Sequence, residues 1–377
     1  MKEQRLAEAL NEIDENYLHA LSEEKPVKKR KYLPYLAIAA CLCLVVFGAV
    51  LFRKGQQPLL PQFSSAVQYA GDGFEAECLY DPAALHSGNP WNEDAELSSL
   101  PVYENLAYTD GSGAPVYLSE EAMRRLAEET AASLGTQIQS TALDLHRDSP
   151  LSLLAETDLG ILRVWGDGAV QFAFSEPLAL SQEYVFLQGT DPKLYRAWNY
   201  SWVDLEQPIG EVAQSYNFYG ESGPVSCRFF EGSGDLQDQI LSYHFSSYHF
   251  SITEDGKLES FSKTNDLRYS AKLLGDYPII SAEEAEQLLL EGSYFSSVPS
   301  TELETGEIRA EDIVKAELIY RSGNLSQVYQ PYYCFYIRLQ GSYLQAEGLQ
   351  SVGYFYVPAV EAEYLTDFPQ YSGSFPG

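Results

Sequence analysis

The chain has 377 residues, with 54 Asp and Glu against 24 Lys and Arg, a formal net charge of −30. The acidic excess lies after Lys54, where 47 acidic residues face 15 basic ones. Nucleic acid is therefore excluded as a partner, because its affinity for proteins comes mainly from Lys and Arg that neutralise phosphates. Hydrophobic residues make up 45% and aromatic residues 13%, which is too many for a chain that is disordered throughout.

The first predicted element is an amphipathic helix over residues 3–22. Its apolar side chains recur every 3 or 4 residues and so share one helix face. An isolated helix of this length cannot bury that face alone, so it is either a docking helix for a cytosolic partner or a juxtamembrane helix that frays. The candidate docking residues are Leu6, Leu10, Ile13, Tyr17 and Leu21.

The second predicted element is a transmembrane helix over residues 33–52. This stretch of 20 residues contains no charge and would span about 30 Å as a helix, the thickness of a bilayer core. Five Lys and Arg lie between Lys25 and Lys31, whereas only Arg53 and Lys54 follow the stretch. The positive-inside rule therefore places the N-terminus in the cytoplasm and the large acidic region outside it.

Two other interpretations of this stretch are weaker. A cleaved signal peptide has a shorter charged region and an apolar run of about 7 to 15 residues, whereas here 32 residues precede a run of 20. Ile38 to Cys41 resembles a lipobox, but eleven more apolar residues follow Cys41. We expect an uncleaved single-pass anchor in the plasma membrane.

The region beyond the anchor shows helix and strand patterns in alternation. Residues 55–115 are rich in Gly, Pro, Ser and Gln and indicate a linker. Ser119 is an expected N-cap for a helix that ends near Gly135, and Ser281 begins a second, shorter helix with a capping box. Asp-Gly pairs at Asp167 and Asp255 predict two hairpin turns.

These patterns predict an α+β fold, in which a single N-terminal transmembrane helix precedes an ectodomain of helices packed on twisted antiparallel sheets. The predicted regions are the cytoplasmic helix and basic patch (1–32), the transmembrane helix (33–52), the extracytoplasmic linker (53–115), a first α+β unit (116–200), a second α+β unit (201–365) and a C-terminal tail (366–377).

No motif for a metal, a cofactor or catalysis is present in the sequence. Zinc motifs such as HExxH and CxxC are absent, and His244 and His249 are an odd number of residues apart, so on one strand they would point to opposite faces. The serine-hydrolase motifs GxSxG and SxxK are also absent. Cys78, Cys227 and Cys334 are an odd number beyond the anchor, which leaves at most one disulfide among them.

The 28 tyrosines are the most unusual feature of the composition. Amphipathic rings on an exposed sheet face can grip a sugar or a peptide, although tyrosine is also simply a favoured strand residue. The candidate binding face of the ectodomain comprises Tyr332, Tyr336, Tyr354 and Tyr356.

Several stretches carry a resemblance to known families. The stretches NEIDENYLHAL, LAIAACLCLVV, LPVYENLAY and LSEEAMRRLAEETAASLG resemble sparsely characterised membrane-anchored, regulator-like proteins of clostridia-type Gram-positive bacteria that are associated with sigma factors. The stretches ISAEEAEQLLLEG, YQPYYCFYIRL and VGYFYVPAV are similar to PepSY-like and YycH/YycI-type extracytoplasmic modules, which modulate signalling or proteases. Neither resemblance implies a catalytic residue.

We therefore expect a non-enzymatic regulatory or sensory membrane protein. Its ectodomain would bind an envelope component or a protein partner, and its N-terminal helix would meet a cytosolic, sigma-factor-like regulator. The alternatives are a cell-envelope hydrolase and a structural accessory subunit of a membrane complex. The identity of the ligand, the oligomeric state and the direction of signalling do not follow from the sequence.

Overall fold

The computed structural model describes part of the chain, namely residues 60–65, 73–82, 85, 88–108, 118–144, 151–179, 203–253, 255–322 and 326–369. The predicted docking helix and the predicted membrane span at residues 33–52 lie outside these residues. Within them, no helix has the length and the apolar character needed to cross a bilayer.

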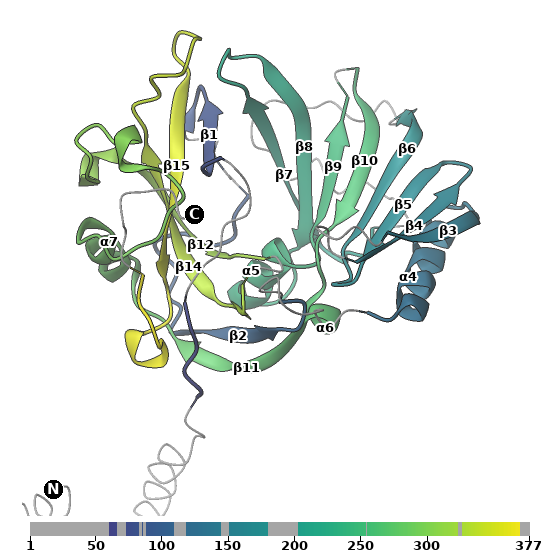
Figure 1. Ribbon diagram of the computed structural model, residues 1–377, viewed down its shortest axis with the longest axis horizontal. Helices are drawn as coiled ribbons and strands as arrows, with labels where there is room; N and C mark the ends of the chain where they lie inside the picture. The colour runs from purple at the N-terminus through teal and green to yellow at the C-terminus, as the bar shows by residue number, and fades with distance from the viewer. Residues whose placement is uncertain are drawn as a thin grey trace, which may run out of the picture. The chain divides into compact units, whose positions relative to one another are not determined.

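One antiparallel sheet of twelve strands dominates the described residues (Figure 1). Its strands run in the order β12 (Ile313–Tyr320), β14 (Pro331–Arg338), β15 (Gln350–Pro358), β1 (Ala76–Leu79), β7 (Pro208–Tyr216), β8 (Ser222–Glu231), β9 (Tyr248–Ile252), β10 (Lys257–Lys263), β6 (Val170–Ala179), β5 (Gly160–Trp165), β4 (Ser152–Thr157) and β3 (Ile138–Asp144).

A second, smaller sheet, four α-helices and the 3-10 helices η3 (Ser300–Glu302), η4 (Ala310–Asp312) and η5 (Ala362–Tyr364) complete the regular structure of the described residues. The sheet is formed by β11 (Ala271–Pro278), β2 (Ser99–Asn105) and β13 (Val328–Tyr329). The helices are α4 (Glu120–Ser133), α5 (Leu236–His244), α6 (Leu267–Ser270) and α7 (Ala282–Leu290).

The predicted fold class is wrong. It combined a transmembrane helix with an α+β ectodomain, whereas the described residues are predominantly antiparallel sheet and include no helix that could span a membrane. Most buried apolar side chains of the described residues lie on strands. The sheet therefore forms most of the core, and only short helices pack against it. Pairing between β6 and β10 also carries the sheet across residue 200, where we predicted a boundary between two units.

Several local predictions are confirmed. Helix α4 begins after Ser119, whose side chain accepts a hydrogen bond from the Ala122 backbone N–H, and α7 begins after Ser281 in the same way. The Asp167-Gly168 and Asp255-Gly256 pairs each connect two antiparallel neighbours, β5 with β6 and β9 with β10. Gly168 and Gly256 have φ values of 86° and 79°, which glycine adopts without steric cost.

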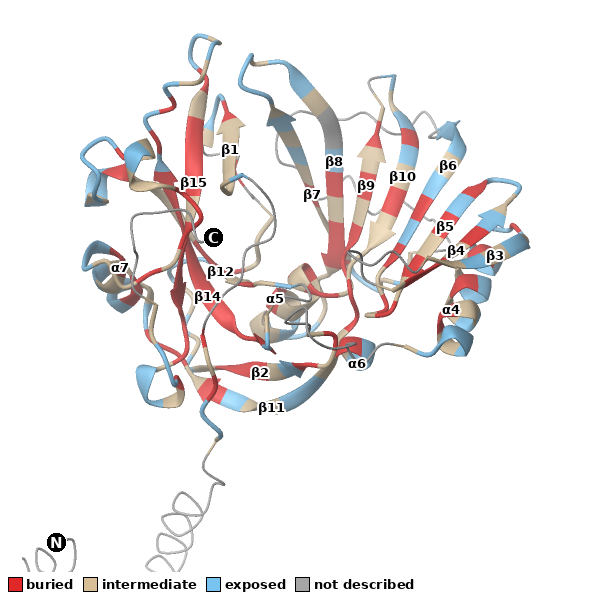
Figure 2. Cartoon of the chain, in the orientation of Figure 1, coloured by how far each residue is buried: buried red, intermediate tan, exposed pale blue. Residues whose placement is uncertain are grey.

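Two main cores stabilise the sheet (Figure 2). Around β3 to β10, α4 packs Met123 and Ala127 against strand side chains such as Leu162 and Phe172, all of them fully buried. Around β12, β14 and β15, the second core buries residues of α5 and α7 against the face of β14 that carries Phe335.

Strand β1 connects the two halves of the large sheet. It pairs with β15 over all four of its residues, but with β7 only through Cys78 and Tyr216. A four-residue strand from the N-terminal part of the chain therefore lies between strands that come much later in the sequence.

Candidate functional site

The four tyrosines of the predicted binding face lie together on one side of β14 and β15. Tyr336 lies opposite Tyr354 in the strand register, and their ring centroids are 5.0 Å apart. Tyr332 and Tyr356 are the next ring pair on this face, at 6.5 Å. The alternation seen in the sequence thus brings all four rings together, as expected for residues two apart on a strand.

This face is not open to solvent. Tyr332 and Tyr336 are each 2% exposed and Tyr356 is 4% exposed, because Phe295, Leu85 and, on the neighbouring strand β1, Leu79 pack against them. We call residues 75–82 together with Leu85 the covering segment. A role in binding stays a prediction for these tyrosines, and it would require the covering segment to move.

Polar contacts bind the covering segment to the tyrosine face. The Tyr356 hydroxyl donates to Glu75 Oε2 at 2.9 Å, and both terminal nitrogens of Arg321 reach the same carboxylate at 3.0 and 3.1 Å. Deeper in the face, the Tyr336 hydroxyl donates to Glu317 Oε2 at 2.7 Å. Burial raises the pKa of Tyr336 well above its usual value, so the hydroxyl keeps its proton and remains a donor.

The cysteines do not point to redox or metal chemistry. Cys78, Cys227 and Cys334 are free thiols. Burial raises the pKa of Cys227 to about 12 and that of Cys334 well above its usual value, so both keep their protons at neutral pH. Among the described residues, no group of three His, Cys, Asp or Glu side chains is placed to hold a metal ion.

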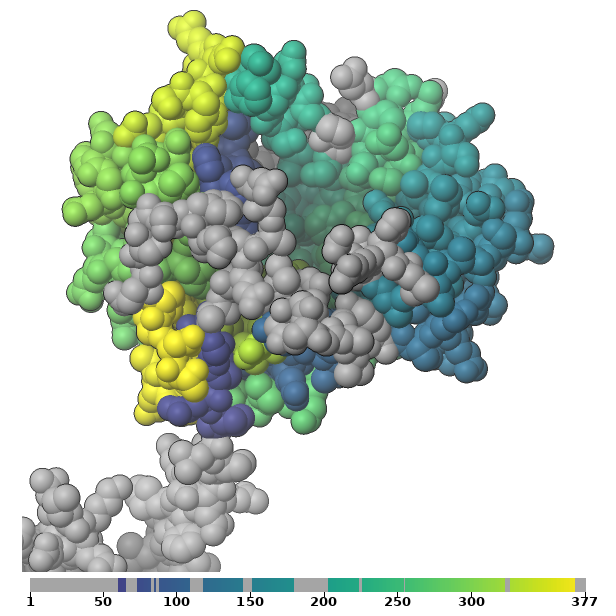
Figure 3. Space-filling model, viewed as in Figure 1, coloured from purple at the N-terminus to yellow at the C-terminus, as the bar shows by residue number. Residues whose placement is uncertain are grey.

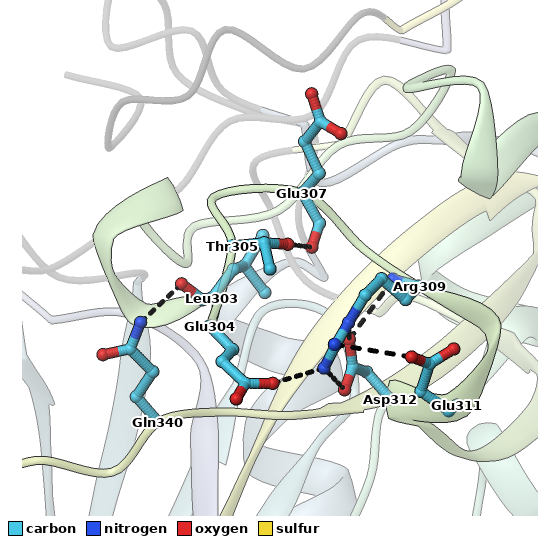
Figure 4. Close-up of polar contacts among 8 residues, drawn as sticks. All are labelled: Leu303, Glu304, Thr305, Glu307, Arg309, Glu311, Asp312 and Gln340. Atoms are coloured by element: carbon cyan, nitrogen blue, oxygen red, sulfur yellow. Dashed lines mark hydrogen bonds and ion pairs between the residues drawn. The ribbon is translucent and has the colours of Figure 1, made fainter.

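The Arg309 cluster is the densest group of charges in the described structure, and it has a structural explanation (Figure 4). Arg309 forms ion pairs with Glu304, Glu311 and Asp312. The hydrogen bond from Arg309 holds the pKa of Asp312 below its usual value. Because carboxylates close to it in the sequence surround the guanidinium, the cluster fixes the conformation of this loop and leaves no unpaired positive charge for an anionic ligand.

A different surface has the properties expected of a docking site. We call it the aromatic rim and define it as Tyr80, Tyr216, Phe218 and Tyr219. Tyr80, Phe218 and Tyr219 are 41%, 42% and 53% exposed, which is unusual for large rings and marks candidate interaction sites. They lie where the end of β1 meets the turn between β7 and β8.

A third segment, residues 341–349 between β14 and β15, supports the aromatic rim. The Gln345 backbone N–H donates to the Phe218 carbonyl at 2.8 Å. Gly220 lies so close to Tyr80 and Ala346 that an added Cβ would be 2.3 Å from the Tyr80 hydroxyl and 2.6 Å from the Ala346 Cβ. In Figure 3 the teal β7–β8 turn lies beside the yellow-green segment at the top of the molecule.

The conformation of the turn is fixed by Asn217. Its Oδ1 accepts hydrogen bonds from the backbone N–H groups of Tyr219 and Glu221, both at 3.0 Å. Its Nδ2 donates to Glu221 Oε2 at 2.8 Å. The Tyr80 ring meets the Tyr216 ring edge to face at 4.9 Å. The Phe218 and Tyr219 ring centroids lie 4.1 Å apart on this turn. The backbone that carries them is therefore fixed before any partner arrives, which lowers the entropic cost of binding.

The charge around the aromatic rim has one sign. Its exposed carboxylates are Asp81, Glu221 and Glu347, and no Lys or Arg occurs in residues 55–123, 197–227 or 339–377, which supply all three segments. Aromatic faces and carboxylates together attract Lys and Arg side chains, the former through cation–π contacts.

The aromatic rim was not among the predicted sites, although the sequence contains one local signal of it. The run Asn217-Phe218-Tyr219-Gly220 places two large rings in a predicted turn, where exposed aromatic residues are unusual. The contact of this turn with Tyr80 and Ala346 joins segments more than a hundred residues apart, and no local pattern reports it.

Comparisons with known proteins do not identify a family. No protein-family model matches the chain, and no curated protein matches it. A solved structure to which the chain is similar is the C-terminal domain of Bacillus megaterium YpeB, with 12% sequence identity, coverage of 67% of this chain and 98% of that chain, and a TM-score of 0.26. A similarity of this size assigns neither a family nor a function.

Proposed function

We propose that the chain is a non-enzymatic regulatory or sensory protein with a single membrane anchor, whose acidic domain outside the cytoplasm binds a basic segment of a protein partner through the aromatic rim. The observation that carries this proposal is the convergence of three cation-free segments around exposed, fixed aromatic rings. The N-terminal helix would contact a cytosolic regulator through the face that contains Leu10 and Ile13.

The anchor in this proposal is residues 33–52. Eleven Leu, Ile, Val or Phe side chains in this stretch would each favour insertion by roughly 0.3 to 0.6 kcal/mol, a total of about 3 to 7 kcal/mol. The basic flank before Leu33 is larger than the flank after Phe52, which supports a cytoplasmic N-terminus.

Both the net charge of the region after Lys54 and the carboxylates at the aromatic rim support a basic partner. The region after Lys54 holds 47 acidic and 15 basic residues, so its field attracts cations from a distance and raises the rate of encounter. At the aromatic rim, Phe218 and Tyr219 offer ring faces next to Glu221, so that a Lys or Arg side chain would find both a ring and a carboxylate.

A synthetic ten-residue lysine peptide tests the proposal against the full chain in detergent. The double variant Phe218→Ala/Tyr219→Ala loses two exposed ring contacts of about 0.5 to 1 kcal/mol each, so we expect roughly five- to thirty-fold weaker binding. The matched control is Tyr269→Ala, which removes a ring that is 38% exposed on α6, outside the aromatic rim.

Equal binding by the parent chain, the double variant and the control would contradict the proposal, because the peptide would then sense only the overall charge. Binding of a glycine-serine peptide as tight as that of the lysine peptide would contradict the assignment of a basic partner.

A further inference from the structure

A row of polar side chains crosses four neighbouring strands on one face of the sheet. Glu211 of β7 lies opposite Arg228 of β8, Arg228 lies opposite His249 of β9, and His249 lies opposite Ser262 of β10. Residues directly opposite one another on neighbouring strands have their side chains on the same face. Strands β8 to β10 form one wall of the hollow that Figure 3 shows between the purple β1 segment and the green strands.

Arg228 is the unusual member of this row. Its guanidinium stacks over the Tyr243 ring at 4.3 Å. Its Nε is enclosed and has no hydrogen-bond partner, and among the described residues no carboxylate forms an ion pair with it. By contrast, Arg163 on the same sheet pairs with Asp144 at 3.0 Å.

Glu211, the carboxylate opposite Arg228 in the strand register, accepts a hydrogen bond from Tyr243 and forms no ion pair with Arg228 among the described residues. Glu211 is 6% exposed, and its Oε2 accepts a hydrogen bond of 2.8 Å from the Tyr243 hydroxyl. Tyr243 of α5 therefore contacts both charged side chains: its hydroxyl donates to Glu211, and its ring face packs against the Arg228 guanidinium. A half-buried arginine with no direct ion pair among the described residues is unusual, since buried charges are normally paired in direct contact.

The other side chains of the row are neutral hydrogen-bonding groups. His249 Nε2 lies 3.2 Å from the Ser247 hydroxyl. Burial and the charge of Arg228 lower the pKa of His249 to about 3, so the imidazole is neutral at physiological pH. Ser262 adds a half-buried hydroxyl opposite it. Neutral imidazole and hydroxyl groups can donate to oxygen atoms of a ligand without competing for the charge of Arg228.

We infer that Arg228 is the anchor of a binding site for a small ligand with a carboxylate group. The planar guanidinium matches a planar carboxylate in a two-point contact, and Ser262 and His249 lie beside it in the row. A monoanion is favoured over phosphate, because a chain of net charge −30 repels each additional negative charge. This site is separate from the aromatic rim, and its existence does not depend on the proposed function.

Acetate, at constant ionic strength set with chloride, is the probe for this inference. With the full chain in detergent, we expect a saturable shift of the Arg228 Nε–H resonance in an NMR titration, and inorganic phosphate should bind more weakly. Arg228→Gln should abolish saturation in thermal-shift titrations, and Arg228→Lys should weaken it at least tenfold because lysine keeps the charge but loses the two-point geometry. The matched control Arg163→Gln should leave acetate binding unchanged.

A linear response without saturation would overturn the inference. So would equal acetate binding by Arg228→Gln and the parent chain, whereas a tighter response to phosphate would overturn the assignment of a carboxylate. If Arg228→Gln fails to fold, the NMR titration of the parent chain alone decides, since a saturable shift must then appear at Arg228 and spread to the His249 ring.

Discussion

Replacement of Gly220 by Ala, compared with the same replacement of Gly256, measures how much the contact of the β7–β8 turn with Tyr80 and Ala346 contributes to stability. Both residues have a left-handed backbone, with φ values of 80° and 79°, so replacement by Ala costs each about 1 to 2 kcal/mol of backbone strain. An added Cβ at Gly256 meets nothing within 4 Å, whereas at Gly220 it would be 2.3 Å from the Tyr80 hydroxyl. The difference between the two variants therefore isolates the contact.

Accommodation of Gly220→Ala requires the Tyr80 ring to move away from Tyr216. This would lose an edge-to-face contact worth about 0.5 to 1.5 kcal/mol and strain the packing against Ala346 by roughly 1 to 3 kcal/mol. We expect Gly220→Ala to unfold at least 2 °C below Gly256→Ala, because each kcal/mol shifts Tm by about 2 to 4 °C in domains of 150 to 250 residues.

Differential scanning fluorimetry of the full chain in detergent measures the two melting temperatures, and the lysine peptide measures the binding of each variant. Binding should fall for Gly220→Ala and stay unchanged for Gly256→Ala. If the two variants melt at the same temperature and bind the peptide equally, the three segments of the aromatic rim do not meet in solution and the reasoning fails.

Four further predictions follow from the sequence and the structure. Protease added to intact cells should remove the region after Lys54 while an N-terminal tag stays protected; loss of the tag would reverse the proposed orientation. Replacement of Leu10 and Ile13 by Asp should abolish crosslinking to a cytosolic partner but leave membrane insertion intact, and recovery of the same crosslinked proteins would end the docking hypothesis. Chelator should leave the melting temperature of the full chain unchanged, since a fall of several degrees would reveal a metal site. Burial lowers the pKa of His249 from its ordinary value of 6.5 to about 3. The contribution of His249 to the free energy of unfolding is therefore fully present above pH 6.5 and falls toward pH 3 by at most about 1.4 kcal/mol per pH unit. His249→Gln should flatten the pH dependence of the urea-denaturation midpoint over this range, and an unchanged slope would show that His249 is not the group responsible.

Features of this fold that depend on neighbouring residues could be predicted from the sequence. Ser119 caps α4 because its hydroxyl accepts a hydrogen bond from the backbone N–H of Ala122, only three residues later. The turns at Gly168 and Gly256 depend on a single residue that tolerates a left-handed backbone. In each case the interaction spans fewer than five residues, so the local sequence is enough to predict the helix start or the turn.

The errors have a common physical cause in long-range pairing. Alternation on β14 indicated that Tyr332 and Tyr336 share a face, but period-two alternation does not tell which residues from distant parts of the sequence pack against that face. The covering residue Leu79 is some 250 residues earlier in the chain, inside a segment predicted to be a linker. The fold class failed because strands distant in the sequence, such as β6 and β10, pair into one large antiparallel sheet, which local helix and strand patterns do not reveal.

The position of β1 has a consequence for how the protein is made. Among the described residues, β1 lies between β15 and β7 in the sheet, yet β15 begins at Gln350, about 270 residues after β1 ends at Leu79. During synthesis, β1 must therefore wait for its main partner until that intervening stretch has been made. Until then, β1 has no partner on the edge that pairs with β15. An unpaired strand edge is prone to aggregation. Pairing between strands this distant in the sequence also forms slowly. Factors that bind the nascent chain during this interval should therefore raise the yield of folded protein.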